Sequence, residues 1–114
     1  MDRLELREFL EKEQELARKW REDAEKAVRE TEALLDEMRD YLRSKGRVAI
    51  TPEEAEQYDD AKKLLREARE ELTFFDGVEK GVNMVAKQIR ERLAMEELAN
   101  AGRWVIRPTK PRRK

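Results

Sequence analysis

The sequence contains no cysteine and no histidine, and its 114 residues include only four glycines and three prolines. Without cysteine there is no disulfide, no thiolate metal site and no thiol nucleophile. Without histidine there is no imidazole acid or base and no Ser-His-Asp triad. The single serine, Ser44, has no partner of a type that commonly activates a hydroxyl. We therefore predict that the chain is not an enzyme and binds no cofactor, metal ion or small-molecule substrate.

Long apolar runs are also missing. No stretch approaches the ~20 residues that a helix needs to span a bilayer. Met1 is followed at once by charged sequence, which is unlike a signal peptide. We therefore expect no membrane partner and a cytoplasmic location, in the manner of many small bacterial and phage proteins.

Charge is what the chain has in abundance. Lysine and arginine number 26, aspartate and glutamate number 27, and together they make up 46% of the residues, against roughly 25% in an average protein. The net charge of −1 conceals an uneven distribution: residues 103–114 carry six cations and no acid, so residues 1–102 carry a net −7. We predict a helical domain over 1–102 and a basic extended tail over 103–114.

Apolar residues recur at heptad spacing in two segments, which predicts an all-α fold. The first segment has a positions at 10, 17, 24, 31 and 38 and d positions from 6 to 41, and no glycine or proline interrupts residues 2–45. Gly46 suits a helix C-terminus, and Thr51-Pro52-Glu53-Glu54 is a strong helix start. We predict a long antiparallel, coiled-coil-like helical hairpin with helices over about 3–45 and 52–100.

One ambiguity lies in the second segment, near residues 73–77. Thr73 or Asp76 could cap a new helix there, and Gly77 and Gly81 each cost about 1 kcal/mol inside a helix. A break at this point would make a three-helix bundle. The heptad phase continues through the segment, however, and hairpin pairing would set Trp20 against the two glycines. We favour one long helix with a packing reason for the glycines.

The apolar stripes are wider than the seam of a two-helix hairpin. Surplus apolar surface often marks a partner, so we predict a homodimer, forming a four-helix bundle, or docking on another protein. The residues outside the strict seam that we assign to partner binding are Phe9, Leu16, Val78, Met84, Val85, Met95 and Leu98.

The basic tail is the second candidate for binding. Pro108 and Pro111 favour an extended backbone, and its cations and tryptophan could contact an acidic protein surface or a nucleic acid. The residues assigned to this role are Arg103, Trp104, Arg107, Lys110, Arg112, Arg113 and Lys114.

Two acidic patterns resemble those of known families. Glu22-x-x-Glu25 and Glu37-x-x-Asp40 resemble the metal-binding pairs of all-α nucleotide pyrophosphohydrolases, but here both pairs lie on one predicted helix, about 22 Å apart, too far to share a metal. The acids just after the predicted turn resemble, in outline, the tip of the hairpin that Gre-type transcription factors insert into RNA polymerase. The tip acids are Glu53, Glu54, Glu56, Asp59 and Asp60.

The function that these features favour is non-catalytic: a protein interaction or assembly protein, such as an adaptor, scaffold or inhibitor, that is oligomeric and acts through helix faces and the tail. Two alternatives stay open. One is a nucleic-acid-associated protein that binds DNA or RNA through residues 103–114. The other is an acidic hairpin tip that inserts into a larger enzyme.

Overall fold

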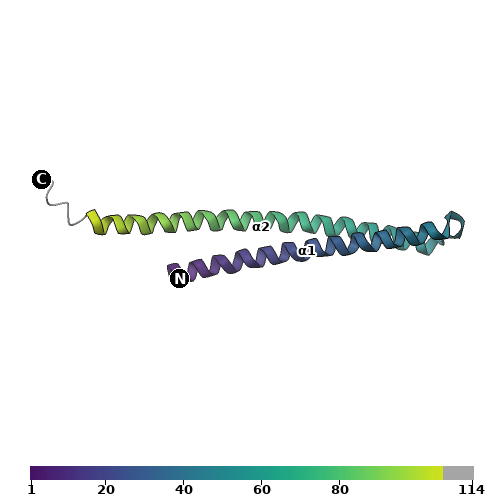
Figure 1. Cartoon of the computed structure of the whole chain (residues 1–114), viewed down its shortest axis with the longest axis horizontal. Coiled ribbons are helices and arrows are strands. Elements are labelled where there is room, and N and C mark those ends of the chain that lie inside the picture. The colour runs from purple at the N-terminus through teal and green to yellow at the C-terminus, as the bar shows by residue number, and fades with distance from the viewer. Residues whose placement is uncertain (107–114) are drawn as a thin grey trace.

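The computed structural model describes residues 1–106, with side chains described through residue 101. Helix α1 spans Arg3–Lys45, a short 3₁₀ turn η1 spans Arg47–Ala49, and helix α2 spans Pro52–Ile106. The two helices run antiparallel along each other from the connection, and α2 extends past the start of α1 (Figure 1). The molecule measures 97 × 23 × 16 Å. The predicted all-α helical hairpin is therefore confirmed.

Local interactions define both ends of α1. The Asp2 carboxylate accepts a hydrogen bond from the Glu5 backbone N–H at 2.8 Å, which satisfies one of the free donors of the first turn. At the other end Gly46 has φ = +79°, a conformation that a side chain would strain, and its N–H donates to the Arg43 carbonyl. The sequence signal at Gly46 thus marks the end of the helix as predicted.

A reciprocal capping box opens α2. The Glu54 N–H donates to Thr51 Oγ1 at 3.1 Å, and the Thr51 N–H donates to Glu54 Oε1 at 3.0 Å. Lys45, at the end of α1, also reaches Glu54 Oε1, at 2.6 Å. This ion pair is the main reason that the pKa of Glu54 falls from 4.5 to about 2, with the Thr51 backbone bond second. One carboxylate therefore joins the last residue of α1 to the first turn of α2.

This joint makes the hairpin sensitive to acid. Because the pKa of Glu54 is lower in the folded chain than in the unfolded chain, its stabilising contribution is complete above about pH 5 and is lost as the pH falls from 4.5 towards 2. We expect Glu54→Gln to lower the melting temperature at neutral pH and to flatten its decline between pH 5 and 2. Thermal melts followed by circular dichroism measure both effects. The exposed neighbour Glu53 provides the control: Glu53→Gln matching the Glu54→Gln profile would contradict this assignment.

The core is a thin line of contact between the two helices. Its periodicity is that of nearly straight helices, because the buried positions recur after 25 residues on both, from Leu10 to Leu35 and from Ala61 to Ala86, which is seven turns at about 3.6 residues per turn. Half of the fully buried side chains are alanines, so the helices approach closely. The buried side chains among the described residues are Leu10, Ala17, Ala24, Val28, Leu35, Ala61, Ala86 and Leu93.

Helix α2 is continuous through residues 73–77, so the three-helix alternative is wrong. The Thr73 hydroxyl donates to the Arg69 carbonyl within the helix and does not cap a new one. The packing reason for the glycines is also wrong, since a Cβ added at Gly77 or Gly81 would meet no atom within 4 Å. A glycine costs only about 1 kcal/mol in a helix interior, and the packing of the flanking turns against α1 outweighs that cost.

The second helix ends later than the sequence indicates. Asn100-Ala101-Gly102 was expected to stop the helix near residue 100, with an extended tail from 103, but α2 continues to Ile106. Gly102 alone is too weak a helix breaker, and the first residue restricted by a following proline is Arg107, before Pro108. Residues 107–114 lie outside the described part of the chain. Within the described part, neither helix has an apolar stretch long enough to cross a membrane.

Candidate interaction surface

One edge of the hairpin is lined by polar contacts between the helices. Near the open end Arg3 pairs with Glu96 at 3.5 Å and Arg7 pairs with Glu97. Further contacts follow towards the connection, and they are Gln14–Asn83 at 2.9 Å, Arg21–Glu79 at 2.8 Å, Glu32–Arg69 at 3.4 Å and Arg39–Tyr58 at 3.3 Å. We call this row the polar edge. It covers the seam on one side along most of the length of the helices.

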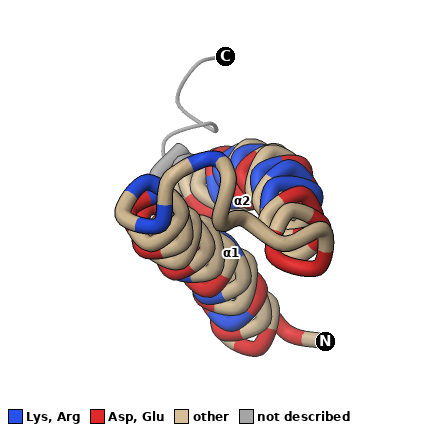
Figure 2. Tube along the Cα trace, turned by 90° about the vertical axis from the view of Figure 1, so that its right-hand side faces the viewer, with Lys and Arg blue, Asp and Glu red and all other residues tan. Residues whose placement is uncertain are grey.

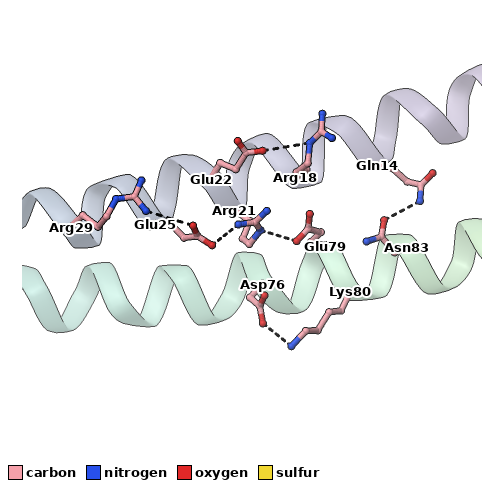
Figure 3. A network of polar contacts seen from close by, with 10 residues as sticks. All are labelled: Gln14, Arg18, Arg21, Glu22, Glu25, Arg29, Asp76, Glu79, Lys80 and Asn83. Atoms are coloured by element: carbon pink, nitrogen blue, oxygen red, sulfur yellow. Dashed lines mark hydrogen bonds and ion pairs between the residues drawn. The ribbon is translucent and has the colours of Figure 1, made fainter.

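Arg21 is the most enclosed member of the polar edge. Its guanidinium donates to Glu79 on α2 and to Glu25 one turn along α1, as Figure 3 shows. The two bonds, first to Glu79 and then to Glu25, raise the pKa of Arg21 further above its usual value. The Glu79 side chain is only 17% exposed, although it occupies an a position of the heptad. Arg21 thus allows an acid to lie at the seam without an uncompensated charge.

The polar edge defines register more than it adds stability. Its pairs are mostly exposed, and exposed ion pairs contribute roughly 0–1 kcal/mol each. Their geometry, however, requires opposite partners at one alignment of the helices. Because Arg21 lies level with Glu79 and the helices are antiparallel, Glu25 lies level with Phe75. This alignment is used below.

The opposite edge of the hairpin is apolar and exposed. Gln14 and Arg21 follow the buried Leu10 and Ala17 by four residues, whereas Phe9 and Leu16 precede them by one, and at 100° per residue these offsets lie on opposite sides of the seam. On α2, Val85 and Asn83 diverge in the same way around Ala86. We define the apolar face as Phe9, Leu16, Trp20, Leu34 and Tyr41 of α1 with Leu64, Phe74 and Val85 of α2, all between 40% and 64% exposed.

An aromatic cluster joins the two helices at the middle of the apolar face. The Trp20 ring on α1 lies 6.0 Å from that of Phe75 on α2, at 51° to it. Phe74 packs edge-on against Phe75 at 5.3 Å. Trp20 and Phe74 nevertheless remain 44% and 64% exposed. Exposed aromatic rings clustered in this way are typical of interface residues.

The structure brings together part of the predicted partner surface. Phe9, Leu16 and Val85 lie on the apolar face, and Val78 is half-buried on the same side of α2. Met95 lies at the open end, where it lines a groove with Leu6 and Ile89. Met84 and Leu98 are exposed by 61% and 74%, but the heptad places both on the side of α2 that points away from α1. These last two do not join the apolar face.

Sequence reasoning missed the central residues of the face. Trp20, Leu34 and Tyr41 occupy d positions of the first heptad and were expected in the seam between the helices. Their exposure, 44%, 46% and 54%, shows otherwise. The seam of α1 passes from the a positions to Val28 and Leu35 at the e positions, because the nearly straight helices follow a 3.6-residue period. The d positions are thereby turned outward.

The rest of the described surface carries mixed charge. Lysine, arginine and acids alternate around both helices (Figure 2), and many pair within one helix, as Arg18 does with Glu22 and Lys80 with Asp76. Among the described residues, no group of three or more acids is placed to hold a metal ion. At the connection, Glu54 is engaged by Lys45 and Thr51, so the first-turn acids serve at least partly to start the helix.

The basic tail is reached only at its first residues. Arg103 and Trp104 lie within α2. The other assigned cations lie outside the described residues, so their predicted role in protein or nucleic-acid binding stays a prediction. No protein-family model matches the chain, and no curated protein or solved structure is significantly similar to it.

Proposed function

We propose that this chain is a non-catalytic interaction or assembly module that binds other polypeptide chains through its apolar face. The observation that carries the proposal is the asymmetry of the hairpin. One edge of the seam is covered by polar contacts, whereas the other presents eight large apolar side chains to solvent in a single row. Scattered exposed apolar residues are normal on a protein surface, but a contiguous row with a polar rim is typical of a binding surface.

The thinness of the core supports the same proposal. Eight side chains are buried in the described chain, and four of them are alanines. A core of this size contributes little beyond what ordering the chain costs. Burial of the apolar face by a partner would therefore stabilise the hairpin as well as form the complex.

Charge substitutions on the two sides of the hairpin test this function. We expect Leu16→Glu with Leu34→Glu to abolish binding of partner chains, because both leucines lie in the middle of the apolar face. Met84→Glu with Leu98→Glu is the matched control, with the same number of new charges on exposed apolar positions of the far side. The measurement is affinity purification of each tagged full-length variant from cells that also express a differently tagged wild-type copy. Equal recovery of all bound proteins by the two variants, at equal helix content, would contradict the proposal.

A further inference from the structure

We propose that the apolar face is the docking surface for a second copy of this chain, in a two-fold symmetric four-helix bundle whose two connections lie at opposite ends. The two-fold axis passes the hairpin at the level of Glu25 and Phe74. This inference rests on the proposed function and names its partner.

The apolar face of α1 is symmetric about one point. Phe9 and Tyr41 lie 16 residues on either side of Glu25, and Leu16 and Leu34 lie 9 residues on either side of it. A second α1 that runs antiparallel across this face therefore sets Phe9 against Tyr41 and Leu16 against Leu34, twice each. Trp20 then lies near Ala27 and Glu30 of the second copy. Every large apolar side chain near the ends of this face finds an apolar partner.

The apolar face of α2 has its own centre of symmetry. Leu64 and Val85 lie 10 and 11 residues on either side of Phe74. An antiparallel second α2 therefore sets Leu64 against Val85 and brings the two Phe74 rings together on the axis. Phe74 is the most exposed side chain of the apolar face at 64%, and this position would bury it.

The two centres lie at the same level of the hairpin. The Arg21–Glu79 pair places Glu25 level with Phe75, and Lys45–Glu54 and Arg3–Glu96 agree with that alignment to within about one residue. A single two-fold axis therefore satisfies both helices at once. The symmetry of α1 and that of α2 come from different residues, so their coincidence is an independent observation for the same arrangement.

Charges beside the apolar face match in this orientation. Lysines border its first half, and acids border its second half, on α1. Lys12 and Glu37 lie 13 and 12 residues from Glu25 on opposite sides, and Lys19 and Glu30 lie 6 and 5 residues from it. Antiparallel pairing sets each lysine near the acid of the other copy. Glu13 also comes level with Glu37 of the second copy, and Lys12 lies beside both carboxylates.

The other face-to-face arrangement, with both connections at one end, brings like charges together. It would lay α1 of one copy over α2 of the other at the same level. Glu30 would then face Glu67 and Glu71, and Asp40 would face Asp60. Like charges set opposite each other oppose association. Charge complementarity therefore selects opposite ends for the two connections.

The face is large enough for a stable dimer. The helices overlap along the 43 residues of α1, so a strip about 65 Å long and about 15 Å wide offers about 1,000 Å² per copy, above the roughly 800 Å² per partner of stable interfaces. The polar edge already covers the other side of the seam, which leaves the apolar face as the side that still gains from burial.

Sedimentation equilibrium of the full chain from 1 to 200 µM tests the stoichiometry. We expect a dimer, weakened more than about 100-fold by Leu16→Glu with Leu34→Glu and unaffected by Met84→Glu. Lys12→Glu should weaken the dimer by about 3- to 10-fold. Adding Glu37→Lys to Lys12→Glu should restore it, because opposite charges then meet again. A monomer throughout the concentration range, or a stoichiometry other than two, would overturn the proposal.

The orientation is tested by cross-linking, which the absence of native cysteine makes unambiguous. Phe74→Cys should oxidise to a disulfide-linked dimer across the axis, whereas Met84→Cys should not. As a variant that keeps Phe74, Leu16→Cys mixed with Leu34→Cys should give a mixed disulfide. A dimer that forms neither product has another arrangement and refutes the inference. A monomer that still binds a different protein through the apolar face would refute only the inference and leave the proposed function standing.

Discussion

Substitution of Ala86 by aspartate is expected to unfold the hairpin at temperatures where the wild-type chain is folded. Ala86 is 1% exposed and lies where α2 approaches α1 most closely. A carboxylate there would be buried, and none of the described polar-edge contacts involves this position. Burial of an uncompensated charge costs about 3 kcal/mol or more, which is a large share of the stability that so thin a core can supply.

The control for this substitution is Ala94→Asp. Ala94 is exposed on the same helix, so both variants lose the same helix propensity and gain the same charge. The difference between them isolates burial. Circular dichroism at 222 nm during urea titration gives the free energy of unfolding of each variant. Equal values for the two would mean that Ala86 does not lie in the seam.

Truncation of adjacent leucines is expected to have very different costs. Leu35 is 4% exposed in the seam, whereas Leu34 is 46% exposed on the apolar face. Leu35→Ala should lower the free energy of unfolding by about 2–3 kcal/mol, because it removes buried methyl groups and leaves a cavity. Leu34→Ala should cost about 1 kcal/mol or less in the isolated chain, since much of its side chain is already in water.

Concentration separates the two leucines further. Denaturation followed by tryptophan fluorescence at submicromolar chain concentration reports on the hairpin alone. If a second copy covers the apolar face, the cost of Leu34→Ala should grow as the concentration rises, whereas that of Leu35→Ala should change less. A larger cost for Leu34→Ala at the lowest concentration would contradict the seam described here.

Local signals in the sequence were sufficient for the elements of the fold. Gly46, the Thr51–Glu54 capping box and the uninterrupted apolar period predicted both helices, their antiparallel pairing and the start of each. They failed at the end of α2, where the stop at Gly102 is a weak propensity effect and the stronger constraint is Pro108. Capping and proline effects act within a few residues, so a single sequence can show them.

The candidate surface was only partly predictable. Phe9, Leu16 and Val85 were assigned to a partner surface from their heptad positions, and the structure places them on the apolar face. Trp20, Leu34 and Tyr41 were assigned to the seam instead. A sequence repeat of 3.5 and a helix period of 3.6 diverge by about 20° per heptad, so over six heptads the pattern alone does not say which flank of the stripe faces inward.

The sequence by itself determined that this protein is two long antiparallel helices with a charged exterior, because caps, turns and apolar periodicity act locally. The tertiary structure decided which flank of each apolar stripe is buried. That choice depends on how the second helix lies against the first: the polar edge formed on the e side, and Trp20, Phe74 and their neighbours were left on the g side. Only a contact between residues some 55 positions apart distinguishes the two sides, and it is this contact that creates the apolar face.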